Sequence, residues 1–338
     1  MSSTGKKTIN HTSSLLCCPQ CKGELDLGKT EYKCKNCHLR FQVLNGIPQL
    51  FVPNEWPDSK NDVTETIRDF YEKTPFPNYD DFDDVGSLID KSRRGVFSRL
   101  LDEQIPLGSS ILECGCGTGQ LSNFLAVANR QVHGVDMCIN SLKLASDFKN
   151  RNGLSRVEFT QMNLFRPCFL EEEFDLVISN GVLHHTSDPR LAFKTISKLV
   201  KPGGYILIGL YHRYGRFATD VRRKIFHLTG DRMKWLDRRW ASGLDSKRKE
   251  TWFKDQYKNP HESKHTINQV LKWFDETDFS FIRTIPSTMP FKGLDSNTYL
   301  FEPEPLSSPL ARAITTSTML LSGHKEGGFF IMIGLRKK

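Results

Sequence analysis

The sequence predicts an α/β fold in which helices cover both faces of a seven-stranded, mostly parallel sheet, preceded by a small cysteine-rich unit. Strand-like and helix-like segments alternate from about residue 87 to residue 210, and five of the nine cysteines lie between positions 17 and 37. Such alternation is typical of a parallel sheet with right-handed crossovers. A chain of 338 residues is also long enough for one large and one small domain.

Apolar runs of strand length predict the individual strands. Five of them span residues 111–114, 131–135, 157–161, 174–179 and 205–210, and two further strands near 279–285 and 328–335 complete the far edge of the sheet. Helices are predicted over residues 63–71 and, from apolar positions such as Leu88, Val96 and Leu100, after residue 87.

Composition shifts divide the chain into four parts. We expect a flexible Ser/Thr/Lys-rich N-terminus at 1–14, a small ribbon at 15–52, a Pro-containing linker at 53–62 and the large domain at 63–338. No apolar run approaches the ~20 residues that a membrane-spanning helix needs, and residues 1–14 are polar. A cytoplasmic protein is therefore expected, and the oligomeric state stays open.

The ribbon contains two C-x2-C pairs, Cys18 with Cys21 and Cys34 with Cys37, separated by 12 residues. Four thiolates at this spacing can close a tetrahedral zinc site, which a unit this small needs because its own core is too small for stability. Four protein ligands leave no open position, so we expect structural zinc. Cys17 is a neighbour rather than a ligand.

A glycine-rich turn at residues 113–119 follows the first predicted strand and precedes a helix. Glycines let the backbone turn sharply and approach a ligand closely. Asp136 ends the second strand, where a carboxylate can accept hydrogen bonds from both hydroxyls of a ribose. Asn163 and Leu164 follow the third strand, where a side-chain oxygen and a backbone amide can read an adenine edge. Glu113 repels a pyrophosphate and suits a cationic amino-acid group, which favours a nucleoside other than NAD.

The segments 113–119, 134–136, 174–185 and 199–204 resemble, in order and spacing, successive motifs of class I methyltransferases with a Rossmann-like fold. The similarity is to the ubiquinone/menaquinone-type (type 11) group. It implies S-adenosylmethionine as cofactor. The cofactor-binding residues expected on this basis are Glu113, Gly115, Cys116, Gly117, Gly119, Asp136, Met137, Asn163, Leu164 and Asn180. Asn163 departs from the Asp that the family more often has.

Methyl transfer requires an aligned acceptor and, in some reactions, a base. His184 and His185 follow the fourth strand at the edge where such sheets bind ligands, so they are the candidate catalytic residues. Tyr71, Tyr211 and His212 are candidates for lining the acceptor pocket.

The acceptor expected by family analogy is a small molecule or a lipid-like compound. RNA is the alternative, because the ribbon is similar to the small zinc-ribbon partner of tRNA, rRNA and release-factor methyltransferases, and to ribbons fused to some 23S rRNA guanine methyltransferases. A non-catalytic binding protein is a more remote alternative.

Residues 211–258 form a basic insertion with 14 Lys/Arg and six Asp/Glu, in a chain of net charge +8. Phe217, Val221, Ile225 and Leu228 recur at helical spacing and predict an amphipathic helix. Four alternatives follow for such a helix. It packs on the sheet with a solvated outer face, it covers the acceptor pocket, it rests on a membrane surface, or it contacts nucleic-acid phosphates.

His261-Glu262-Ser263-Lys264-His265 matches the H-E-x-x-H pattern of zinc metalloproteases, which requires both histidines on one helix. Thr266 and Gln269 form a predicted capping box, which starts the next helix after these histidines. We therefore interpret the match as accidental. A helix that starts earlier, at Asn259-Pro260, would contain both histidines, so a metalloprotease is kept as a remote alternative.

Overall fold

The structure is a computed structural model. It describes residues 15–56, 62–76, 79, 84–237, 240, 246–289, 292–308, 310–312, 314–315 and 328–338. The predicted N-terminal segment 1–14, part of the predicted linker and part of the basic insertion lie outside these residues.

The central sheet has the predicted α/β class. Its seven strands are β5 (Ser110–Cys114), β6 (Gln131–Asp136), β7 (Val157–Met162), β8 (Phe174–Asn180), β9 (Val200–Tyr211), β10 (Phe279–Ile285) and β11 (Phe329–Arg336). They lie in the order β7-β6-β5-β8-β9-β11-β10. The pairs from β7 to β9 are parallel, and β11 is antiparallel to both of its neighbours. The predicted mostly parallel, seven-stranded sheet is thus confirmed.

Two apolar cores cover the two faces of this sheet. Neighbouring residues of β5 point to opposite sides, so that Ile111 belongs to one core and Leu112 to the other. The core around Ile111 includes residues of α2 (Val85–Arg94), α3 (Val96–Gln104), α4 (Gln120–Val127) and α5 (Ile139–Arg151), and the core around Leu112 includes α6 (Pro189–Ser197) and α9 (Ile267–Glu276). No helix among the described residues is both long and apolar enough to cross a bilayer.

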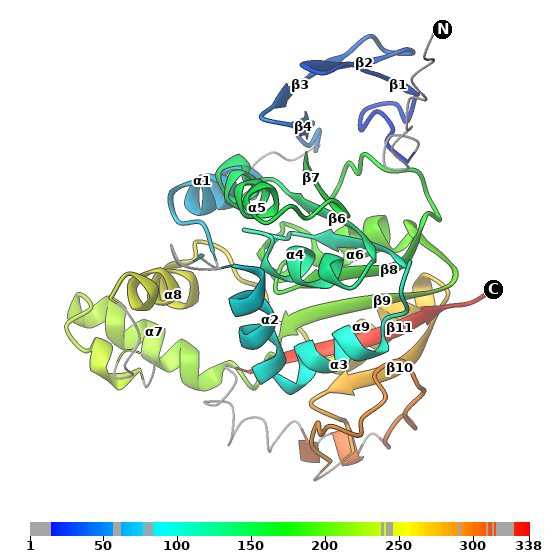
Figure 1. The fold of residues 1–338 in the computed structure, drawn as a ribbon. Coiled ribbons are helices and arrows are strands. Elements are labelled where there is room, and N and C mark those ends of the chain that lie inside the picture. The colour runs from blue at the N-terminus through cyan, green and yellow to red at the C-terminus, as the bar shows by residue number, and fades with distance from the viewer. Residues whose placement is uncertain are drawn as a thin grey trace, which may run out of the picture.

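The ribbon continues the central sheet. Its strands are β1 (Leu25–Leu27), β2 (Glu31–Cys34), β3 (Arg40–Leu44) and β4 (Ile47–Leu50). β4 pairs in parallel with β7, so the sheet extends to eleven strands, as Figure 1 shows at the top of the molecule. The backbone N–H of Cys17 also donates to the carbonyl of Cys168 at 2.8 Å. The ribbon is therefore docked on the sheet through backbone hydrogen bonds.

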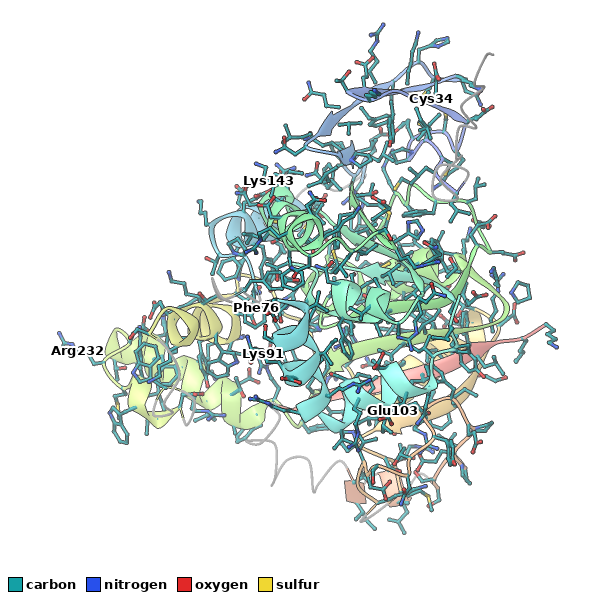
Figure 2. All side chains as sticks on the ribbon, in the orientation of Figure 1. Cys34, Phe76, Lys91, Glu103, Lys143 and Arg232 are labelled. Atoms are coloured by element: carbon teal, nitrogen blue, oxygen red, sulfur yellow. The ribbon has the colours of Figure 1, made fainter. Side chains whose placement is uncertain are left out.

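The basic insertion contains α7 (Phe217–Thr229) and α8 (Ser246–Lys258), which project from the sheet, with Arg232 at their outer tip (Figures 1 and 2). The prediction that the side of α7 with Phe217 and Leu228 packs on the sheet is wrong, because these residues are 61% and 83% exposed. Phe226 is buried instead, against Phe253 and Tyr257 of α8. The position of α8 thus decides which side of α7 is covered.

Candidate active site

A cavity of about 440 Å³ lies at the carboxyl edge of the sheet. The loops after β5, β6, β7 and β8 line it, together with α1 (Thr64–Lys73) and α8. Strand order reverses at β5, which has β6 on one side and β8 on the other. Open parallel sheets bind ligands at such a point, because the loops there diverge to opposite faces.

The glycine turn after β5 is held against the end of β6. The N–H groups of Gly115 and Cys116 donate to the carbonyl of Val135 at 2.7 and 2.9 Å. Gly115 has a φ of +74°, and a Cβ there would lie 2.4 Å from a methyl carbon of Val182. A side chain at this position is therefore excluded both by the backbone conformation and by the neighbouring residue.

Gly119, by contrast, lies at the N-terminus of α4 rather than on the cavity wall. A Cβ added to it would lie 2.6 Å from the Cβ of Ala145 and 2.8 Å from the ring of Phe159. This glycine allows α4 to approach its neighbours closely, which is a packing role.

Two carboxyl groups, the buried Glu113 and the half-buried Asp136, face the cavity. Burial raises the pKa of Glu113 to about 7 and that of Asp136 to about 6. The Ser122 hydroxyl donates to Glu113, while Asp136 accepts from the N–H groups of Gly117 at 2.9 Å and Cys138 at 2.8 Å. Each carboxyl group thus has some of its acceptor sites occupied and others open to a ligand. A cation or a hydroxyl donor of the ligand would stabilise the ionised form.

Asn163 is held by the segment that follows the ribbon. Its side-chain nitrogen donates to the carbonyl of Val52 at 2.9 Å and to the side-chain oxygen of Asn54 at 2.8 Å. Its side-chain oxygen accepts from the N–H of Phe165 at 3.0 Å and keeps one acceptor site. This oxygen can accept a hydrogen bond from an adenine amino group, as the sequence-based hypothesis requires.

Nine of the ten residues expected to bind the cofactor line the cavity. They are Glu113, Gly115, Cys116, Gly117, Asp136, Met137, Asn163, Leu164 and Asn180.

The two candidate histidines lie in a short 3-10 helix, Leu183–His185, but have different surroundings. His185 lines the cavity, and its Nδ1 lies 2.8 Å from the carbonyl oxygen of His261. A carbonyl only accepts, so Nδ1 carries the proton and Nε2 of the neutral ring has a free lone pair. His184 is fully buried away from the cavity, and burial holds its pKa well below the ordinary value. Of the two candidate bases, only His185 therefore lines the cavity.

Of the three candidates for the acceptor pocket, Tyr71 and Tyr211 line the cavity and His212 does not. His212 is buried, its Nδ1 accepts from the N–H of Gly215 at 3.3 Å, and burial lowers its pKa to about 4. Its contacts are structural.

Sequence reasoning missed Asp255 and Gln256, which line the cavity from α8. Asp255 accepts a hydrogen bond from the Tyr71 hydroxyl at 2.9 Å. The Gln256 amide donates to the other Asp255 oxygen at 2.9 Å and to the Tyr211 hydroxyl at 2.8 Å. The only signal in the sequence is an acid followed by an amide within a basic helix, and that pattern alone does not indicate a site.

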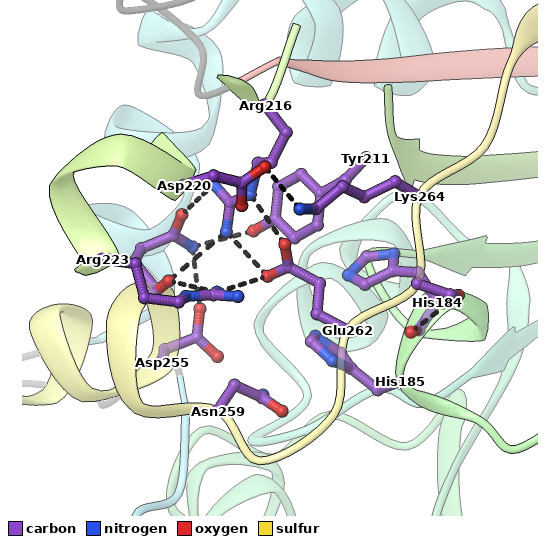
Figure 3. Close-up of polar contacts among 12 residues, drawn as sticks. His184, His185, Tyr211, Arg216, Asp220, Arg223, Asp255, Asn259, Glu262 and Lys264 are labelled. Carbon is purple, nitrogen blue, oxygen red and sulfur yellow. Dashed lines mark hydrogen bonds and ion pairs between the residues drawn. The ribbon is translucent and has the colours of Figure 1, made fainter. Parts of the chain in front are cut away.

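A buried ion-pair network packs against the ring of Tyr211 (Figure 3). The Arg216 guanidinium stacks 3.6 Å from the Tyr211 ring centroid and donates to both carboxylate oxygens of Glu262, at 3.0 and 2.8 Å. Arg223 donates to the same carboxylate at 3.0 Å. Although burial opposes ionisation, these arginines lower the pKa of Glu262 to about 2. Glu262, the acid of the H-E-x-x-H match, is thus an ion-pair partner.

The histidines of that match lie in a loop, and α9 begins after the capping box of Thr266 and Gln269. The capping-box prediction is confirmed. Within the described part of the chain, only the cysteine group has the arrangement of a metal site.

Cys18, Cys21, Cys34 and Cys37 place their sulfur atoms within 4.8 Å of one another. Two of the Sγ–Sγ distances are 3.6 Å (Cys18 to Cys37) and 3.5 Å (Cys21 to Cys34). A tetrahedral zinc with bonds of about 2.3 Å places its sulfurs about 3.8 Å apart. The four thiols therefore fit a zinc ion, and neither Cys17 nor His38 belongs to the group.

Residues 112–208 match the family model Methyltransf_11, described as a methyltransferase domain. This segment runs from β5 into β9 and contains most of the cavity-lining loops. The chain therefore carries a methyltransferase domain, and the resemblance expected from its motifs is confirmed.

Two curated relatives name different acceptors. Phosphoethanolamine N-methyltransferase 2 of Caenorhabditis elegans is 29% identical over 187 residues, which are 49% of this chain and 41% of the relative. Ubiquinone biosynthesis O-methyltransferase of Leptothrix cholodnii is 32% identical over 109 residues, which are 31% of this chain and 46% of the relative. The chain thus spans less than half the length of either relative.

Among solved structures, the complex of the Haloferax volcanii Trm112 methyltransferase activator with a methyltransferase contains a similar chain. The two align with a TM-score of 0.46 and 11% identity, over 75% of this chain and 94% of that one.

Proposed function

We propose that this protein is an S-adenosylmethionine-dependent methyltransferase whose acceptor is a small molecule or a lipid-like compound. The observation that carries the proposal is the convergence of Glu113, Asp136 and Asn163 on one cavity at the switch point of a methyltransferase domain. These three residues come from the ends of three neighbouring strands.

Each of these residues suits one part of the cofactor. Glu113 attracts the ammonium group of the methionine part, since opposite charges attract strongly in a partly buried site. Asp136 accepts hydrogen bonds from the ribose hydroxyls, and Asn163 accepts one from the adenine amino group. Gly115 and Gly117 let the backbone approach the cofactor. A pyrophosphate beside Glu113 would be repelled, which favours this nucleoside over a dinucleotide.

His185 is the base in the proposed mechanism. S-adenosylmethionine, when bound, would supply an electrophilic methyl group on its sulfonium. Nε2 of His185 would take the proton that the acceptor loses when it is methylated. Burial keeps the pKa of His185 below its ordinary value, so the ring is neutral and ready to accept a proton at pH 7.

The cysteine group is proposed to hold a structural zinc ion. Four protein sulfurs would complete its coordination, so it would supply folding free energy rather than chemistry. The docking of β4 on β7 extends this stabilisation to the edge of the sheet beside Asn163.

An exposed stripe on α7 favours a lipid-like acceptor over RNA. Phe217, Val221, Lys224 and Leu228 lie on one side of the helix and are all exposed. Apolar residues mixed with a lysine are typical of a helix that rests on an anionic membrane surface. Co-sedimentation with vesicles of phosphatidylcholine and phosphatidylglycerol tests this contact. Leu228→Ser should weaken it, whereas the exposed Leu310→Ser should not.

The function is tested by calorimetry with S-adenosylmethionine, followed by transfer of tritium from the labelled methyl group to cell extracts. We expect saturable binding and a labelled product. Asp136→Ala should abolish binding, and Asp147→Ala, an exposed acid of α5, should not change it. Absence of binding to the parent protein would contradict the proposal. Binding without transfer would leave a non-catalytic binding protein.

A further inference from the structure

The charged side chains among the described residues that line the cavity are all acidic. Among the described residues there, three are acidic, namely Glu113, Asp136 and Asp255, and none is Lys or Arg. Glu113 and Asp136 belong to the proposed cofactor end. Asp255 belongs to a separate hydrogen-bonded group with Tyr71, Gln256 and Tyr211, which we assign to the acceptor.

Asp255 has hydrogen-bonding capacity left for a ligand. A carboxylate has about four acceptor sites, and Tyr71 and Gln256 occupy one on each oxygen. The side chain is 8% exposed, and no cation of the described residues forms an ion pair with it. A nearly buried carboxylate with unused acceptor sites is costly unless a ligand donates to it.

The negative charge of Asp255 is balanced by charged residues that lie next to it but do not line the cavity. Arg216 and Arg223 share the single carboxylate of Glu262, and Arg216 also donates to the side-chain oxygen of Gln256 at 2.8 Å. Two arginines, Glu262 and Asp255 sum to a formal charge of zero. A ligand that brought an ammonium group would leave an excess positive charge. A phosphate would meet carboxylates, with no Lys or Arg among the described residues that line the cavity.

We propose that the methyl acceptor is an uncharged compound recognised through its hydroxyl groups, one of which donates a hydrogen bond to Asp255. This inference rests on the proposed methyltransferase function. The reacting hydroxyl lies toward Nε2 of His185, and a second hydroxyl of the same acceptor binds Asp255.

The hydrogen bonds around Asp255 hold it in place for this task. Asn259 donates to the Tyr71 hydroxyl at 2.9 Å, and that hydroxyl donates in turn to Asp255. Gln256 links Asp255 to Tyr211. Because α1, α8 and β9 all contribute to this chain of contacts, the carboxylate is oriented before the acceptor arrives, which reduces the entropy cost of binding.

The first experiment identifies the charge of the product. The purified protein and tritiated S-adenosylmethionine are incubated with aqueous and organic-solvent extracts of cells, and the labelled products are passed over anion and cation exchangers at pH 7. Label in the unretained, neutral fraction is the expected result. Because S-adenosylmethionine is itself a cation, the label is compared with that of a control without the enzyme. Label retained on either exchanger in excess of this control, or released by ribonuclease, would overturn the inference while supporting methyl transfer. No label anywhere, with the cofactor bound, would contradict the proposed function instead.

The second experiment uses the neutral fraction as acceptor and compares two carboxylate-to-amide changes on α8. Asp255→Asn should lower kcat/KM about 10- to 100-fold, because a hydrogen bond to a charged group is lost. Glu250→Gln, at a partly buried ion pair with Lys234 that does not line the cavity, should leave kcat/KM unchanged. Calorimetry should give the same S-adenosylmethionine affinity and thermal unfolding the same Tm for all three proteins. An unchanged kcat/KM in Asp255→Asn would overturn the inference.

Discussion

The side chain of Asn54 accepts a hydrogen bond from Asn163 at 2.8 Å and so joins the segment after the ribbon to the loop after β7. Asn54 also donates to Asp62 and Thr64 at the start of α1. A single side chain thus connects the ribbon, the first helix and the proposed adenine-binding loop. Changes in the ribbon should therefore reach the cofactor site.

Asn54→Ala should weaken S-adenosylmethionine binding up to about tenfold, because a hydrogen bond contributes about 0.5–1.5 kcal/mol and Asn163 loses one of its partners. Calorimetry at constant pH measures the change. Glu55→Ala is the matched control, since Glu55 is exposed and pairs with Arg166 rather than with Asn163. Equal affinity in both variants would show that the loop keeps its position without Asn54.

Removal of the metal should affect the same site. A chelator that strips zinc from the cysteine group should lower the Tm, because a unit of this size depends on its metal for stability. It should also weaken cofactor binding, because β4 pairs with β7 next to Asn163. Metal content, Tm and cofactor affinity are measured on the same sample. A loss of metal with unchanged affinity would mean that the ribbon is energetically independent of the site.

Cofactor affinity should depend on pH. In the unliganded protein, burial raises the pKa of Glu113 to about 7, and only the ionised carboxylate attracts an ammonium group. Binding is therefore strongest above pH 7 and weakens as the pH falls through that value, by about tenfold between pH 8 and pH 6. In Glu113→Gln, binding should be weaker and much less sensitive over this range. A flat profile in the parent protein would contradict the role of Glu113.

The two histidines should differ in kinetics. His185→Asn should lower kcat by about 10²- to 10⁴-fold without changing cofactor affinity, since it removes the proposed base. His184→Phe keeps a ring of similar shape beside Tyr211, whose centroid is 4.4 Å away, and should leave kcat near that of the parent. A large loss of kcat in His184→Phe together with a nearly unchanged kcat in His185→Asn would assign the base to His184.

Two phenylalanines of α7 test which side of this helix is covered. Phe226→Ala should lower the free energy of unfolding of this region by about 3–5 kcal/mol, because it leaves a cavity between α7 and α8. Phe217→Ala should change it by no more than about 0.5 kcal/mol, since Phe217 is 61% exposed. Urea unfolding measures both values. Similar losses in the two variants would show that the Phe217 side is also packed.

The sequence by itself determined the elements whose signals are local. The glycine turn at 113–119, the two C-x2-C pairs and the capping box at Thr266 each depend on a few neighbouring residues, because backbone conformation, metal-ligand spacing and capping are short-range effects. The seven strands followed from apolar runs, since strands buried on both faces are almost continuously hydrophobic.

Only the tertiary structure decided which residues meet. Phe217 and Phe226 have equally apolar side chains, and the choice between them was made by Phe253 and Tyr257 of another helix. Asp255 lies 184 residues from Tyr71, and nothing near either residue in the chain indicates that they form a hydrogen bond. The physical reason is that burial and ligand contacts depend on the packing of distant segments, which local sequence patterns do not encode.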